Sequence, residues 1–173
     1  MPRQVALLRG VNLGKRQVVM SDLRAVLEAA GYGDVSTLLA SGNVVLDAKE
    51  KGAKLEAALE RVIADGLGLK TDVFVRTAAE LDAVIAANPF DAFAKKQPNF
   101  LVVTFMRATA SKAELRRLRR SATAGEEAAV QGKHCLLTSS FPRARRPSAE
   151  DVRARHRAQL EHVCKPAAAA RGE

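Results

Sequence analysis

The strongest constraint on the fold is the order in which strand-like and helix-like segments follow one another over the first 76 residues. Short apolar runs that are typical of strands alternate with longer stretches whose apolar residues recur at helical spacing, in the order β-α-β-β-α-β. Right-handed crossovers of the two βαβ halves would interleave the four strands into one antiparallel sheet with both helices on one face. Residues 1–76 are therefore predicted to form a ferredoxin-like subdomain.

Local signals predict where each segment of this subdomain begins and ends. The first helix is expected to have Ser21 as its N-cap and Gly31 as its stop, and the second to end near Gly66. A hairpin turn is expected at Ser41-Gly42-Asn43. The strands are expected at residues 3–9, 35–40, 44–46 and 71–76, and the helices at 22–30 and 53–65.

Residues 77–173 are predicted to form a second α+β unit. Its first helix, residues 78–87, follows Thr77, and Glu80 lies at the position that completes a capping box. A hairpin turning at Gly132 is expected later in the unit. The remaining segments are a strand at 100–106, a helix at 112–120, hairpin strands at 127–131 and 135–138, and a C-terminal helix at 148–164.

Positive charge is concentrated in the C-terminal part of the chain. The formal net charge is +9, and residues 111–173 contribute 14 Lys and Arg against 7 Asp and Glu. Arginine makes planar, bidentate contacts to phosphate, so a basic patch can bind nucleic acid or an acidic partner, whereas charge runs are more often simply solvated. With one Tyr and no Trp, the chain has few platforms for base stacking. The patch consists of Arg116, Arg117, Arg119, Arg120, Arg143, Arg145 and Arg146.

The remaining composition points to a cytoplasmic protein without a resident metal or cofactor. No apolar run reaches the roughly 18 residues that a membrane-spanning helix needs, and the N-terminus has no signal-peptide pattern. In a reducing compartment both cysteines are expected to be free thiols. The histidines and cysteines lack the spacing of metal ligands, and the sequence shows no pattern of a catalytic nucleophile with its general base. These residues are His134, Cys135, His156, His162 and Cys164.

The segment Arg9-Gly10-Val11-Asn12-Leu13-Gly14 is the best local candidate for a binding site. It is a glycine-containing loop between a strand and a helix, with Arg9, Lys15 and Arg16 beside it, and such loops offer backbone N–H groups to anions. It lacks both the Walker ending and the three-glycine dinucleotide spacing. A structural role is the alternative, in which the glycines permit tight turns and Asn12 bonds to its own loop.

Several short motifs together resemble the bacterial domain-of-unknown-function 1697 (DUF1697) family over about residues 3–138. They are Arg9 to Gly14, Met20-Ser21-Asp22-Leu23-Arg24, Ser41-Gly42-Asn43-Val44-Val45, Val75-Arg76-Thr77 and Ala87-Asn88-Pro89-Phe90. The resemblance implies an α+β fold of two ferredoxin-like (βαββαβ-type) subdomains with antiparallel sheets, here 1–76 and 77–173. It implies no activity, cofactor or catalytic residue. The family's motif positions are Arg9, Gly10, Asn12, Gly14, Ser41, Gly42 and Asn43.

The C-terminal segment departs from that family from about residue 139. The family's usual Gly-Arg-Ser-Lys-Leu and Arg-Asn-Trp-Asn-Thr segments are absent, and the arginine density rises where they would stand. Two hypotheses explain this: strong divergence, or a shifted reading frame over about residues 134–162. The coding DNA distinguishes them, because a frameshift requires another frame to encode the missing segments.

Three classes of function are compatible with these patterns. The first is a binding module for an anionic ligand, either a phosphate-bearing metabolite or nucleic acid, that uses Arg9, Gly10, Asn12, Gly14 and Lys15 with Ser41, Gly42 and Asn43. The second is an enzyme acting on a small anionic metabolite in a cleft between the subdomains. The third is an assembly role in which a sheet edge or face pairs with another copy. Ligand binding is the favoured reading, and the oligomeric state is left open.

Overall fold

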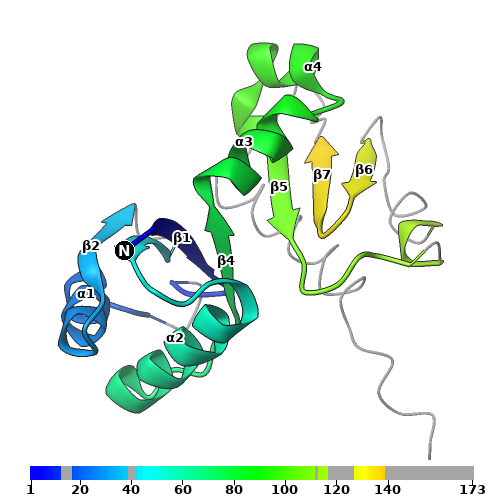
Figure 1. The fold of residues 1–173 in the computed structure, drawn as a ribbon. Coiled ribbons are helices and arrows are strands. Elements are labelled where there is room, and N and C mark those ends of the chain that lie inside the picture. Colours follow the sequence, from blue (N-terminus) through cyan, green and yellow to red (C-terminus); the bar gives the residue numbers. More distant parts are fainter. Residues whose placement is uncertain (13–16, 39–41, 112, 117–126, 139–173) are drawn as a thin grey trace, which may run out of the picture. The chain divides into compact units, whose positions relative to one another are not determined.

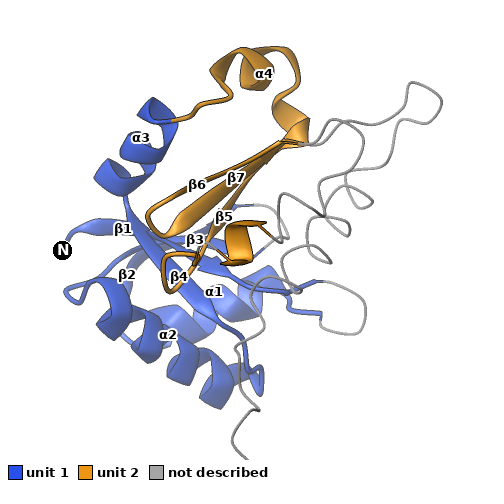
Figure 2. Cartoon of the chain, turned by 90° about the vertical axis from the view of Figure 1, so that its right-hand side faces the viewer, with its two compact units in different colours: residues 1–87 blue, residues 88–173 orange. Residues whose placement is uncertain are grey.

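The fold comprises two antiparallel sheets and several helices (Figure 1). The computed structural model describes residues 1–12, 17–38, 42–111, 113–116 and 127–138 of the 173-residue chain. The chain divides into two compact units, residues 1–87 and 88–173 (Figure 2). The boundary expected after residue 76 stays a prediction.

The first unit is built on a four-stranded sheet in the order β2-β3-β1-β4. Its strands are β1 (Arg3–Leu8), β2 (Gly33–Leu38), β3 (Asn43–Asp47) and β4 (Val73–Thr77). All three pairings are antiparallel, and β1 lies in the centre, where Ala6 is opposite Val44 on one side and Val75 on the other. The strands are therefore interleaved in the way that the order of segments predicts.

Two amphipathic helices, α1 (Met20–Ala29) and α2 (Gly52–Leu67), cover one face of this sheet. Their buried residues belong to the same hydrophobic core as every second residue of the central strands. The period of two along a strand and of about 3.6 along a helix places these side chains on facing surfaces. This core includes Ala6, Leu8, Val44, Leu46, Val73 and Val75 from the sheet, and Leu23, Leu27, Leu55, Leu59 and Ile63 from the helices.

Several predicted element ends differ from the observed ones by one or two residues, and three of these differences are informative. Ser21 is not the N-cap of α1, because the helix begins at Met20 after Val19, and the Ser21 hydroxyl lies 3.3 Å from Asp22. α2 continues through Gly66 to Leu67, and the next residue, Gly68, takes the left-handed conformation that commonly terminates a helix. β4 begins only at Val73, so the residues before it belong to the preceding loop.

The capping box at the start of α3 (Ala78–Ala86) is confirmed. The Thr77 hydroxyl accepts from the N–H of Glu80 at 3.3 Å, and the Glu80 carboxylate accepts from the N–H of Thr77 at 2.8 Å. Two backbone donors that the first helical turn leaves unpaired are thereby satisfied. The motif also fixes the direction in which the chain leaves β4.

The second unit contains a three-stranded antiparallel sheet in the order β5-β7-β6. Its hairpin of β6 and β7 turns at Gly132, as predicted, with φ of 54°. Helix α4 and the short 3-10 helix η1 were not predicted, because each is too short to show a period. The elements are α4 (Asp91–Lys96), η1 (Pro98–Phe100), β5 (Leu101–Phe105), β6 (Ala128–Gln131) and β7 (His134–Thr138).

Two predicted helices fall wholly or partly outside the described residues. Of the helix predicted at 112–120, residues 113–116 are helical and the others lie outside the described ranges. The predicted C-terminal helix at 148–164 lies outside them entirely. Among the described residues, no helix combines the length and the apolar character needed to cross a membrane.

Candidate functional site

The described residues directly after β1 turn sharply, and Asn12 connects them to Val18, which precedes α1. Gly10 and Asn12 both have positive φ, at 70° and 53°, which turns the chain sharply after the strand. The Asn12 amide nitrogen donates to the carbonyl of Val18 at 3.1 Å, and its oxygen accepts from the N–H of Val18 at 2.6 Å. Asn12 therefore closes this loop as a bridge between its two ends, which is the structural role considered for it from the sequence.

Arg9 joins the end of β1 to the segment that leads into β4. Its N–H donates to the carbonyl of Asp72 at 2.9 Å, and its own carbonyl accepts from the Thr71 hydroxyl at 2.6 Å. The Arg9 guanidinium lies 3.2 Å from the Asp72 carboxylate, with side chains that are 46% and 44% exposed. An ion pair this open to water contributes little to stability and exchanges partners readily.

Gly42, which directly precedes β3, lies against Leu8 at the end of β1 and against Val11. The N–H of Leu8 donates to the carbonyl of Gly42 at 2.9 Å. Gly42 has φ of 78°, and a Cβ added there would lie 2.2 Å from Val11 Cγ2 and 3.0 Å from Leu8 Cβ. Only glycine combines this backbone conformation with so close an approach. The buried Val11 of the Arg9 segment therefore packs directly against Gly42.

The structure thus brings most of the described candidate residues together at one end of β1. Asn43 completes the group, because it pairs with Leu7 in the sheet directly after Gly42. Gly14, Lys15 and Ser41 lie outside the described residues. We call the assembled group the β1-end site; its described members are Arg9, Gly10, Asn12, Gly42, Asn43, Thr71 and Asp72.

Two members of the β1-end site were missed by the sequence reasoning. Thr71 and Asp72 were expected inside a strand, but they precede β4 and contact Arg9 across a separation of more than sixty residues. The only signal in the sequence is a polar pair in front of an alternating apolar run. Because no local rule connects that pair to Arg9, the contact follows from the sheet order alone.

The predicted basic patch is largely outside the described part of the chain. Arg116 is described and its side chain is exposed. The other six members, at positions 117, 119, 120, 143, 145 and 146, lie outside the described ranges. The proposal that these arginines form one surface therefore still rests on the sequence.

His134 and Cys135 occupy neighbouring positions on β7 with different surroundings. Cys135 is 1% exposed and packs in the core of the second unit with Met106. The His134 ring nitrogen lies 3.3 Å from the Gln131 side-chain oxygen, and the ring is tilted against Phe105. Within the described ranges, no group of three or more His, Cys, Asp or Glu side chains is placed to hold a metal ion.

The chain is similar to a known sequence family and to a solved structure. The sequence model of a family described as "Protein of unknown function (DUF1697)" matches residues 1–135. A solved structure, that of the conserved bacterial protein SP0830 from Streptococcus pneumoniae, is similar with a TM-score of 0.64 and 22% identity. The match covers 81% of this chain and 78% of that one, and at this identity it shows the fold alone. No curated protein matches the chain.

Proposed function

Because the chain belongs to the DUF1697 family, whose function is unknown, we propose a function from the geometry of the chain itself. The proposed function is the binding of a phosphate-bearing anionic ligand at the β1-end site. One observation carries this proposal. The two glycine-containing segments, which are more than thirty residues apart in the sequence, meet at the end of β1, where Gly42 lies against Val11 and Leu8, and the Arg9 residue that carries the guanidinium directly follows Leu8.

The electrostatics of Arg9 support this assignment. Its partner Asp72 is nearly half exposed, so water competes for the carboxylate and the pair is weak. A phosphate offers the guanidinium more acceptor oxygens and more charge than one carboxylate, and it can take up the same fork of N–H donors. An incoming anion would therefore replace Asp72 with little loss of stability. Lys15 and Gly14 belong to the same proposal on the sequence alone.

Replacement of Arg9 tests the proposal directly. We expect Arg9→Gln to weaken the binding of inorganic phosphate by the full chain about tenfold, because a hydrogen bond to a charged group contributes roughly 1.5–3 kcal/mol. Arg24→Gln removes the same charge from an exposed position on α1 and serves as the matched control. Titration calorimetry measures both. Equal affinities of the two variants would overturn the assignment of Arg9.

We also propose that the first unit has the ferredoxin-like arrangement as a whole. The support is the strand order β2-β3-β1-β4, the antiparallel pairing throughout, and the shared core of α1 and α2 on one face. These are the features that the split βαβ topology combines. An experimental structure of residues 1–87 within the full chain tests this, and a different strand order would contradict it.

A further inference from the structure

Among the strands that the structure describes, β4 lies at an edge of the four-stranded sheet, where none of them pairs with its outer row of backbone groups. In an antiparallel pair, alternate residues direct their N–H groups toward the partner strand and the others direct them outward. The outward donors of β4 belong to Val73, Val75 and Thr77, because these N–H groups bond away from β1. Such a row is a template on which another strand can pair.

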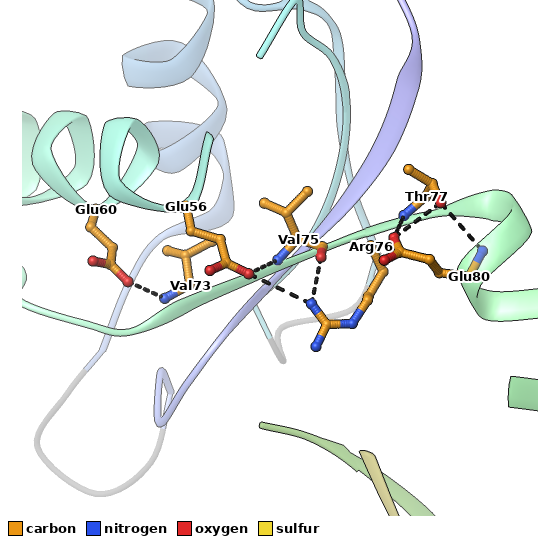
Figure 3. A network of polar contacts seen from close by, with 7 residues as sticks. All are labelled: Glu56, Glu60, Val73, Val75, Arg76, Thr77 and Glu80. Carbon is orange, nitrogen blue, oxygen red and sulfur yellow. Dashed lines mark hydrogen bonds and ion pairs between the residues drawn. The ribbon is translucent and has the colours of Figure 1, made fainter. Parts of the chain in front are cut away.

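Each of these three outward donors is accepted by a glutamate side chain (Figure 3). The N–H of Val73 donates to Glu60 at 2.8 Å and that of Val75 donates to Glu56 at 3.0 Å. The N–H of Thr77 donates to the carboxylate that completes the capping box, at 2.8 Å. We call Glu56, Glu60 and Glu80 the carboxylate row.

The spacing of the row explains why two of its members come from one helix. Glu56 and Glu60 are four residues apart on α2, so both point to the same side of the helix. Their targets are two residues apart on β4, and successive outward donors of a strand are separated by roughly 6.6 Å. One turn of helix rises about 5.4 Å, which lets consecutive turns serve consecutive donors.

At the middle of the row, an ion pair takes the place of a neighbouring peptide. The Arg76 guanidinium donates to the carbonyl of Val75 at 2.6 Å, while Glu56 accepts from the N–H of the same residue. The guanidinium and the carboxylate lie 3.6 Å apart, and their side chains are only 12% and 11% exposed. Val75 therefore has both backbone groups satisfied by side chains, as a paired strand would satisfy them.

The opposite edge of the sheet is interrupted in a different way. The pairing of β2 with β3 shifts register between Gly33 and Ser36, and Asp34 in this interval has φ of 42°. The Asp34 carboxylate is bonded to Arg3 of β1. A bulge that interrupts the pairing of an edge strand and carries a charged side chain is an obstacle to strand addition, so both edges carry such an obstacle.

From these contacts we infer that the carboxylate row closes the β4 edge to strand addition by a second copy of this chain. The β4 sequence Val-Phe-Val-Arg-Thr is rich in residues that favour strands, so an open edge would be a strong template for antiparallel pairing between two copies. The glutamates occupy the donors that such pairing requires. This inference does not depend on anion binding at the β1-end site.

Amide hydrogen exchange in the full chain tests the closure residue by residue. In Glu60→Ala, we expect the Val73 amide to exchange about tenfold faster than in Glu60→Gln, which keeps an acceptor oxygen. The Val75 and Thr77 amides should exchange alike in both variants, because their own acceptors are unchanged. Equal exchange of Val73 in the two variants would overturn the inference. Both variants keep the Glu56–Arg76 ion pair, so neither is expected to be severely destabilised.

Self-association tests the consequence of closure. Replacing all three glutamates of the row by Ala, or all three by Gln, removes the same charge and differs in the acceptor oxygens. The Ala set is expected to self-associate at concentrations where the Gln set does not, as measured by sedimentation velocity. Exchange at Ala6 and Val44 reports that the central strands remain folded. A folded Ala set that sediments like the Gln set would overturn the role in excluding a second copy; should the Ala set not fold, the Glu60 comparison decides.

Discussion

Gly42 is the residue on which the contact between the two glycine-containing segments depends. Its positive φ disfavours any side chain, and an added Cβ would overlap Val11 at 2.2 Å. Neither the conformation nor the overlap can be relieved without moving the end of β1, because the Gly42 carbonyl accepts from the N–H of Leu8. The geometry of the β1-end site therefore depends on this one small residue.

We predict that Gly42→Ala destabilises the protein by about 2–4 kcal/mol, from left-handed strain together with overpacking. Gly31→Ala is the matched control, since Gly31 has φ of 88° but nothing within 4 Å of an added Cβ. That variant should lose only about 1–2 kcal/mol from strain. Chemical denaturation measures both losses, and equal losses would show that the contact with Val11 contributes nothing.

At the scale of elements, local rules succeeded where an element depends on its neighbours in sequence. The capping box of Thr77 and Glu80 and the turn at Gly132 were predicted from residues within a few positions of each other. The prediction that α2 ends near Gly66 was wrong, because the reason for a glycine at this position is tertiary packing and not helix termination. An added Cβ at Gly66 would lie 2.5 Å from Val26 Cγ1 of α1, so this glycine serves the approach of two helices rather than the end of one.

This explanation of Gly66 predicts a specific coupling. In an open helix, Gly→Ala stabilises by about 1 kcal/mol. Here Gly66→Ala should instead destabilise by roughly 1–2 kcal/mol, because the stiff Val26 side chain cannot move aside. In the background of Val26→Ala, the same substitution should become neutral or stabilising. A double-mutant cycle by thermal denaturation measures the coupling, and additive effects would contradict the packing role of Gly66.

At the scale of the whole molecule, the sequence combined the Arg9 loop and the Ser41-Gly42-Asn43 turn in one hypothetical binding site, but it could not show whether the two segments approach each other. The strand order brings described members of both to one end of β1. Thr71 and Asp72 were missed for the same reason. Contacts across sixty residues depend on topology, and a single sequence carries no local signal for them.

The basic patch makes a further prediction at this scale. If the arginines bind nucleic acid, the binding of duplex DNA by the full chain should weaken steeply between about 50 and 200 mM salt, with a log-log slope near −0.9 per phosphate contact. Changing Arg116, Arg117, Arg119 and Arg120 to Gln should make the slope less steep, whereas Arg24→Gln should leave it unchanged. A shallow slope in the unaltered chain would identify the arginines as a solvated surface.

The central claim is that the β1-end site binds a phosphate-bearing anion, and a phosphate titration followed by NMR of the isotope-labelled full chain tests it most directly. We expect saturable shifts of the backbone amides of Arg9, Gly10, Gly42 and Asp72, which are lost in Arg9→Gln and kept in Arg24→Gln. Shifts that fail to saturate at millimolar phosphate, or that persist unchanged in Arg9→Gln, would contradict the claim.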